Sequence, residues 1–79
     1  MKAKVFVRLK PGVLDVQGKA VERSVVEHGH SAIQNVRIGK LIEFEYTGAD
    51  SAAAKKEIEE LCKSFLANTI IENFEITIS

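Results

Sequence analysis

Few side chains in this sequence combine a reactive group with a spacing that would support chemistry. His28 and His30 flank Gly29, and the sole cysteine, Cys62, lies far along the chain on an apolar stripe. A zinc site needs three or four ligands, so this histidine pair is incomplete. No His or Lys is placed to lower the pKa of the Cys62 thiol, as a nucleophile would require. We therefore predict no catalytic residue and no metal ligand, with the histidines at a helix end and Cys62 in the core.

Val16-Gln17-Gly18 resembles the phosphate loop of acylphosphatases. That loop needs an Arg at a fixed spacing, where this chain has Glu22, with Arg23 one residue late. A carboxylate at that position would repel a phosphate, so we set this resemblance aside.

The composition describes one small domain of balanced charge. The chain has 79 residues, with 11 basic and 11 acidic side chains, one cysteine and no Trp. A domain of this size buries only about 60% of its unfolded surface, so we expect residues 1–79 to form one domain that associates as a homodimer or larger homo-oligomer. The lone cysteine excludes an internal disulfide, and no leader or long apolar run is seen, so we expect a cytoplasmic protein outside the membrane. Nucleic-acid binding is not expected, because no basic and aromatic cluster is present.

Hydrophobic periodicity predicts six elements in the order β-α-β-β-α-β. Alternating apolar residues indicate strands over 2–10, 36–38, 41–46 and 70–78, and helical spacing indicates helices over about 15–28 and 52–66. Gly39-Lys40 fits the two-residue type II′ turn of a hairpin, because Gly tolerates the positive φ needed at its first position.

Capping residues and apolar stripes predict the ends and the buried faces of the two helices. Asp15 is the expected N-cap of the first helix, and Gly29 its C′ residue. Gly18 lowers helix propensity, which suggests a close approach to the sheet or to a partner. Asn68 is expected to end the second helix in the left-handed conformation. The buried stripe of that helix is expected to comprise Ala54, Ile58, Leu61, Cys62 and Phe65.

This order predicts an α+β, ferredoxin-like, two-layer sandwich, in which two helices cover one face of a four-stranded antiparallel sheet. The usual strand order 4-1-3-2 puts the first strand between the third and the fourth. Its outward cations would then lie beside outward carboxylates of its neighbours, namely Lys2, Lys4, Arg8 and Lys10 beside Glu43, Glu45 and Glu75. Phe6, Leu41 and Ile71 share this outward face, so we predict an interface there. Exchange of the C-terminal strand between protomers stays open.

Two family resemblances bear on function. Lys10-Pro11-Gly12-Val13-Leu14 resembles the Pro-Gly turn of ACT-type amino-acid-binding domains, although these commonly have an acidic residue where this chain has Lys10. The more extensive resemblance covers essentially the whole chain, and is to the PurS family, the small subunit of phosphoribosylformylglycinamidine (FGAM) synthase. Its motifs are Leu9-Lys10-Pro11-Gly12-Val13-Leu14-Asp15 with Gln17-Gly18, Val36-Arg37-Ile38-Gly39-Lys40, and Cys62 with Leu66-Ala67-Asn68 and Ile70-Ile71-Glu72. Val16 and Thr69 stand where the family often has Pro.

The PurS resemblance implies a non-catalytic subunit in purine biosynthesis. In that family the complex converts formylglycinamide ribonucleotide (FGAR) to FGAM with ATP, Mg and glutamine. The resemblance implies that this chain binds no cofactor itself. The resemblance implies a homodimer that bridges the synthetase and glutaminase subunits and supports ammonia transfer. It also implies that Arg37, Gly39 and Lys40 form an exposed turn that contacts a partner or is only solvated. Asn68 and Glu72 would contact a partner or cap the chain locally. The alternative is an ACT-like amino-acid-binding regulator.

Overall fold

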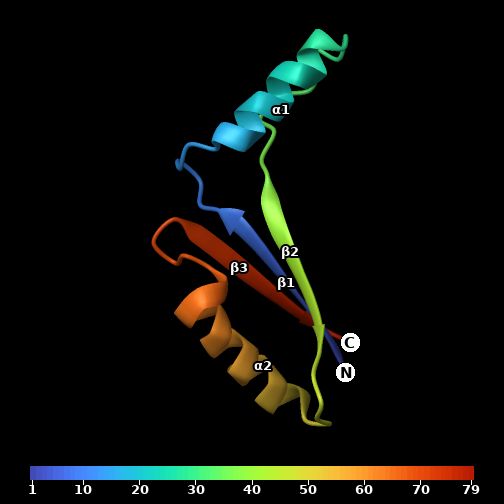
Figure 1. Ribbon diagram of the computed structural model, residues 1–79, viewed down its shortest axis with the longest axis vertical. Helices are drawn as coiled ribbons and strands as arrows, with labels where there is room; N and C mark the ends of the chain where they lie inside the picture. The colour runs from blue at the N-terminus through green and yellow to red at the C-terminus, as the bar shows by residue number, and fades with distance from the viewer.

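Three strands and two helices follow one another along the chain (Figure 1). The structure is a computed structural model that describes all residues, 1–79. Its elements are β1 (Lys2–Leu9), α1 (Val16–Glu27), β2 (Gly39–Glu45), α2 (Ser51–Leu61), the π-helical turn η1 (Cys62–Leu66) and β3 (Glu72–Ile78). None of the helices combines the length and the apolar character that a transmembrane span requires.

The sheet is antiparallel, with the strands in the order β2-β1-β3. Val5 in the middle of β1 lies opposite Ile42 of β2 and Ile76 of β3. Strand alternation turns these residues toward α2, as the sequence predicts. The buried core combines this face of β1 with the inner side of α2 and the following turn, and comprises Ala3, Val5, Val7, Ile58, Cys62 and Ala67.

The opposite face of the sheet carries paired charges. Lys2 lies opposite Glu45, and Lys4 lies opposite Glu43. Arg8 Nη1 approaches Glu75 Oε2 at 3.4 Å. These positions confirm the predicted placement of the cations of β1 beside carboxylates of β2 and β3. An exposed ion pair such as Arg8–Glu75 contributes only about 0–1 kcal/mol.

The predicted hairpin around Gly39-Lys40 is wrong, so the sheet has three strands and not four. Gly39 lies inside the β1–β2 ladder opposite Arg8, and positive φ occurs only at Gly12, Gly29 and Asn35. A Cβ on Gly39 would lie 2.6 Å from the Val7 carbonyl oxygen, so this glycine serves a close approach between strands and not a turn. Since the chain does not reverse here, residues 36–38 continue away from the sheet. The position of β1 between its two neighbours is as predicted.

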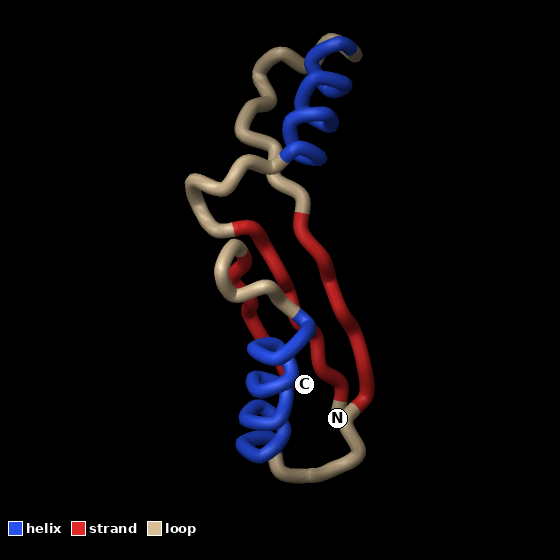
Figure 2. The backbone as a smooth tube through the Cα atoms, turned by 60° about the vertical axis from the view of Figure 1, so that its left-hand side comes forward, coloured by secondary structure: helices blue, strands red, loops and turns tan.

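The segment from Lys10 to Ile38, here called the arm, extends beyond the end of the sheet and carries α1 (Figures 1 and 2). The molecule is therefore elongated, at 48 × 25 × 14 Å. Only α2 covers the sheet, so the prediction that both helices pack on one face is wrong for α1 within a single chain. The cause is the missing hairpin turn, because α1 could fold back onto this sheet only if residues 36–38 reversed direction.

The caps of α1 follow the sequence expectations. Asp15 is the N-cap and accepts a hydrogen bond from the Gly18 N–H at 2.7 Å. Gly29 adopts a φ of 93° just after the helix, as a C′ glycine does. Gly18 does serve a close approach, because a Cβ there would lie 2.3 Å from the Val36 carbonyl oxygen.

The end of the second helix differs from the prediction. The Ala67 N–H donates to the Cys62 carbonyl at 3.0 Å, which closes a wide π turn and keeps both residues buried. The wider turn rotates Phe65 outward, where it is 71% exposed, so its predicted place in the core is wrong. Asn68 does not adopt a positive φ. Its side-chain oxygen instead accepts from the Ile70 N–H at 3.2 Å.

Candidate functional site

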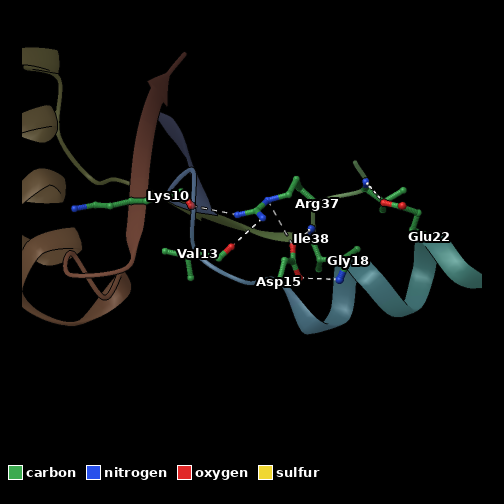
Figure 3. A network of polar contacts seen from close by, with 8 residues as sticks. Lys10, Val13, Asp15, Gly18, Glu22, Arg37 and Ile38 are labelled. Atoms are coloured by element: carbon green, nitrogen blue, oxygen red, sulfur yellow. Dashed lines mark hydrogen bonds and ion pairs between the residues drawn. The ribbon is translucent and has the colours of Figure 1, made fainter. Parts of the chain in front are cut away.

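The junction between the arm and the sheet is organised by Asp15 (Figure 3). Its side chain is only 4% exposed and uses both oxygens. Oδ1 accepts from the Gly18 N–H and Oδ2 from the Ile38 N–H, each at 2.7 Å. These two hydrogen bonds, followed by the positive charge of Arg37, hold the pKa of the carboxyl below its usual range. One carboxylate therefore caps α1 and ties the helix to the chain that returns from it.

Arg37 closes the same junction from the other side. Its guanidinium donates to the carbonyl oxygens of Val13 at 3.0 Å and Lys10 at 3.2 Å, and its Nε lies 3.9 Å from Asp15 Oδ2. Glu22 adds a further tie, because its carboxylate accepts from the Val36 N–H at 2.9 Å. The arm is thus held as a unit, in which α1 is tied to residues 36–38.

The structure brings five of the eight sequence-predicted interface residues to one groove. The groove has a volume of about 640 Å³ and follows the ends of β1 and β2. Phe6, Arg37, Gly39, Lys40 and Leu41 line it, together with Arg8. The Arg8 guanidinium carbon lies 5.4 Å from the centre of the Phe6 ring, a cation–π contact. The groove therefore offers apolar surface beside cations, which suits the apolar and acidic side chains of another protein.

The other three predicted residues do not line this groove. Asn68 and Glu72 contact each other, because the Asn68 N–H donates to Glu72 Oε1 at 2.7 Å. Glu72 also lies 4.0 Å from Lys40 Nζ. Ile71 sits in the turn before β3, where its carbonyl accepts from the Lys10 N–H at 2.8 Å. These three residues make contacts within and around the turn that precedes β3, at the same end of the sheet as the groove.

The two side chain types with reactive groups, histidine and cysteine, make local contacts in the structure. His28 Nδ1 lies 2.7 Å from the Ser24 carbonyl at the end of α1, and no three His, Cys, Asp or Glu side chains cluster as metal ligands. Cys62 is fully buried, and burial, with a smaller effect from Glu59, raises the pKa of its thiol.

Sequence reasoning missed the apolar surface of the arm. Leu14 and Val16 are 70% and 72% exposed at the start of α1, and further apolar side chains are exposed along the arm, namely Val21, Val26 and Ile33. Two of these, Val16 and Val26, lie off the stripe through Leu14, Val21 and Val25. Apolar residues on more than one side of a short helix were the available signal.

Comparison with known proteins decides the family. The family described as PurS, phosphoribosylformylglycinamidine (FGAM) synthase, matches residues 2–79. The chain belongs to the PurS family. A PurS relative from Synechocystis, described as a phosphoribosylformylglycinamidine synthase subunit, is 42% identical over 76 residues, which is 94% of this chain and 76% of that protein.

Solved PurS structures share the fold. The crystal structure of PurS from Methanocaldococcus jannaschii has a TM-score of 0.88 and 33% identity, and the match covers 99% of this chain and 94% of the other. That protein is described as one of the subunits of formylglycinamide ribonucleotide amidotransferase in the purine biosynthetic pathway. A chain of the structure of PurLQS from Thermotoga maritima matches with a TM-score of 0.87 and 25% identity, covering 96% of this chain and 93% of the other. The fold of this chain is thus the α+β fold of PurS structures.

Proposed function

We propose that this chain is the non-catalytic small subunit of FGAM synthase in de novo purine biosynthesis. The observation that carries the proposal is the family match over residues 2–79. In this proposal the synthetase and glutaminase reactions belong to other subunits of the complex. The complex would convert FGAR, ATP and glutamine to FGAM in the cytoplasm. ATP and Mg would bind to those other subunits and not to this chain.

The role proposed for the subunit is to bridge the synthetase and the glutaminase and to support the transfer of ammonia between them. A PurS chain within a structure named PurLQS supports an assembly of this kind. The groove lined by Phe6, Lys40 and Leu41 is the surface that we assign to a partner subunit. Arg37 and Gly39 shape its wall, and Asn68, Glu72 and Ile71 hold the adjacent turn.

The bridging subunit is proposed to be a homodimer. A compact monomer of this mass would expose about 4,700 Å², whereas this chain exposes 5851 Å². The excess is about 1,100 Å² per chain, and two such surfaces fall in the range of about 2,000–5,000 Å² that obligate homodimers bury.

The test is an assay of FGAM formation by the purified synthetase and glutaminase subunits, with and without this chain. We expect the chain to increase the glutamine-dependent rate and to leave the rate with added ammonia unchanged. An effect on neither rate would refute the bridging role. In that case, stabilisation of the chain by a single amino acid in a thermal-shift screen would favour the ACT-like alternative.

Substitutions in the groove test the assigned surface. We expect Lys40→Glu and Leu41→Ser to weaken binding to the partner subunits, because they reverse a charge and remove apolar contact area. Lys55→Glu on the exposed side of α2 is the matched control and should bind normally. Normal binding of all three variants, measured by calorimetry, would remove the groove from the interface.

A further inference from the structure

The lining of the groove at the ends of β1 and β2 is rich in cations. Arg8, Arg37 and Lys40 are among the 10 residues that line it, and none of these residues is Asp or Glu. The chain as a whole is balanced, with 11 basic and 11 acidic side chains. This local excess of positive charge attracts negatively charged groups of another molecule.

The three cations differ in how firmly they are held. Arg37 is fixed in the junction, because its guanidinium donates to two backbone carbonyls. Arg8 lies 3.4 Å from Glu75, and its side chain is 62% exposed. Lys40 lies 4.0 Å from Glu72, and its side chain is 59% exposed. Ion pairs with such exposed cations are weak. A carboxylate that enters the groove can therefore take over Arg8 or Lys40 while Arg37 stays in place.

The groove also has an apolar part. Phe6 and Leu41 lie directly opposite each other on β1 and β2, and Leu41 is 51% exposed. Arg8 lies opposite Gly39, and a Cβ on Gly39 would be 3.4 Å from Arg8 Cγ. The absence of a side chain at Gly39 thus leaves space beside Arg8. An apolar side chain of another molecule can pack on Phe6 and Leu41, while a neighbouring carboxylate reaches Arg8.

The sheet of a second copy of this chain does not offer free carboxylates to the groove. Glu43 and Glu45 on its outward face lie opposite Lys4 and Lys2 of their own chain. The charge pattern therefore favours a different protein as the occupant, with acidic side chains that have no cation beside them.

We propose that the groove binds an acidic segment of a partner subunit. Carboxylates of this segment pair with Arg8 and Lys40, and an apolar side chain packs on Phe6 and Leu41. The inference rests on the bridging function proposed above and specifies the chemistry of its docking site. On docking, Lys40 exchanges Glu72 for a carboxylate of the partner. Because charge attraction acts over a distance, it speeds association and makes it sensitive to salt.

Zero-length cross-linking tests the exchange at Lys40. A carbodiimide joins a lysine amine directly to a carboxylate in contact with it, and mass spectrometry locates both residues. In the free chain the carboxylate within reach is that of Glu72. With the purified synthetase and glutaminase subunits present, we expect a link from Lys40 to an Asp or Glu of one of them. Lys40→Arg is the matched control, because it keeps the charge but its guanidinium does not form the link.

Binding measurements with uncharged variants test the contribution of the two cations. Arg8→Gln and Lys40→Gln should each weaken binding to the linked subunit about tenfold at about 0.1 M salt, where charges are screened over about 10 Å. The loss should be much smaller at about 1 M salt, where the screening length is about 3 Å. Lys40→Arg, and Lys55→Gln on the exposed side of α2, should bind as the wild type does.

Two results would overturn the acidic segment as the occupant. One is a link from Lys40 to a second copy of this chain, or to Glu72 alone in the assembled complex. The other is equal binding by all variants at low salt. If the chain still raises the glutamine-dependent rate in either case, the bridging function stands and only the docking site is wrong. A chain that raises neither rate would instead refute the bridging function itself.

Discussion

Asp15 uses both carboxylate oxygens inside the protein, and this should appear in the pH dependence of stability. The Ile38 and Gly18 N–H groups, and then Arg37, lower its pKa in the folded chain. The charged carboxylate should therefore make its full contribution to the free energy of unfolding above about pH 4, which is the ordinary pKa of Asp in an unfolded chain. It is then lost as the pH falls through the lower pKa of the folded state.

Thermal unfolding of Asp15→Ala and wild type across this pH range measures the effect. We expect the variant to melt at a lower temperature at neutral pH, with the difference shrinking as the solution is acidified. Glu27→Ala, on the exposed side of α1, is the control. A difference that stays constant with pH would contradict the role of the charged carboxylate.

The Cys62 thiol should be unreactive in the native protein. Its thiol is fully buried, and burial raises its pKa, so less thiolate is available at neutral pH than in a free cysteine. We expect labelling by a thiol reagent to be slow in native conditions and immediate in denaturant. Rapid labelling of the folded protein would show that the end of α2 opens easily.

Single residues also explain part of what sequence reasoning got wrong. Arg37 looks like a free cation in the sequence, yet its guanidinium donates two hydrogen bonds and forms an ion pair within the junction. The partners, Lys10, Val13 and Asp15, are more than twenty residues away, and only the folded chain brings them together. An Arg37 substitution would therefore disturb the arm as well as any interface, which is why Lys40 is the better probe of the groove.

At the scale of the elements, two glycines hold neighbouring segments at short distance. A Cβ would lie 2.3 Å from the Val36 oxygen at Gly18 and 2.6 Å from the Val7 oxygen at Gly39. Gly→Ala in a helix normally stabilises by up to about 1 kcal/mol. Here we expect Gly18→Ala and Gly39→Ala each to destabilise by about 1–3 kcal/mol, the cost typical of overpacking.

Urea unfolding measures these effects. Ser24→Ala on the exposed side of α1 is the control for helix propensity and should be neutral or slightly stabilising. If Gly18→Ala instead raised the free energy of unfolding, the arm could shift to accommodate the added methyl group. The close approach of Gly18 to Val36 would then not fix the position of α1.

The elements themselves were largely predictable, because alternation and helical spacing are local properties. β1, β3 and both helices lie close to the predicted ranges, and the caps at Asp15 and Gly29 are correct. Gly39 shows where local reasoning fails, since a glycine before Lys40 is equally consistent with a turn and with a close approach to Val7. The prediction that Phe65 is buried was wrong for a similar reason. A π turn rotates the residues that follow it around the helix axis, and the spacing of apolar residues in the sequence does not reveal such a turn.

For the whole molecule, the exposed arm predicts that stability depends on concentration. If a second copy covers the arm, dilution shifts the equilibrium toward the less stable single chain. We expect the melting temperature to fall with each tenfold dilution, and light scattering to report the dimer at the higher concentrations. A melting temperature that is independent of concentration would show that the single chain is stable with its arm uncovered.

The two ends of the chain lie side by side at the end of the sheet opposite the arm (Figure 1). Lys2 and Ser79 exchange two backbone hydrogen bonds of 2.9 Å, so β1 and β3 hold the termini together. A short flexible linker could therefore join Ser79 to Met1, and new ends could be cut between Gly29 and His30 at the tip of the arm. The fold would then not depend on the order in which the elements follow one another along the chain. A circular permutant of this design should reach the same fold with the helix of the arm as its last element.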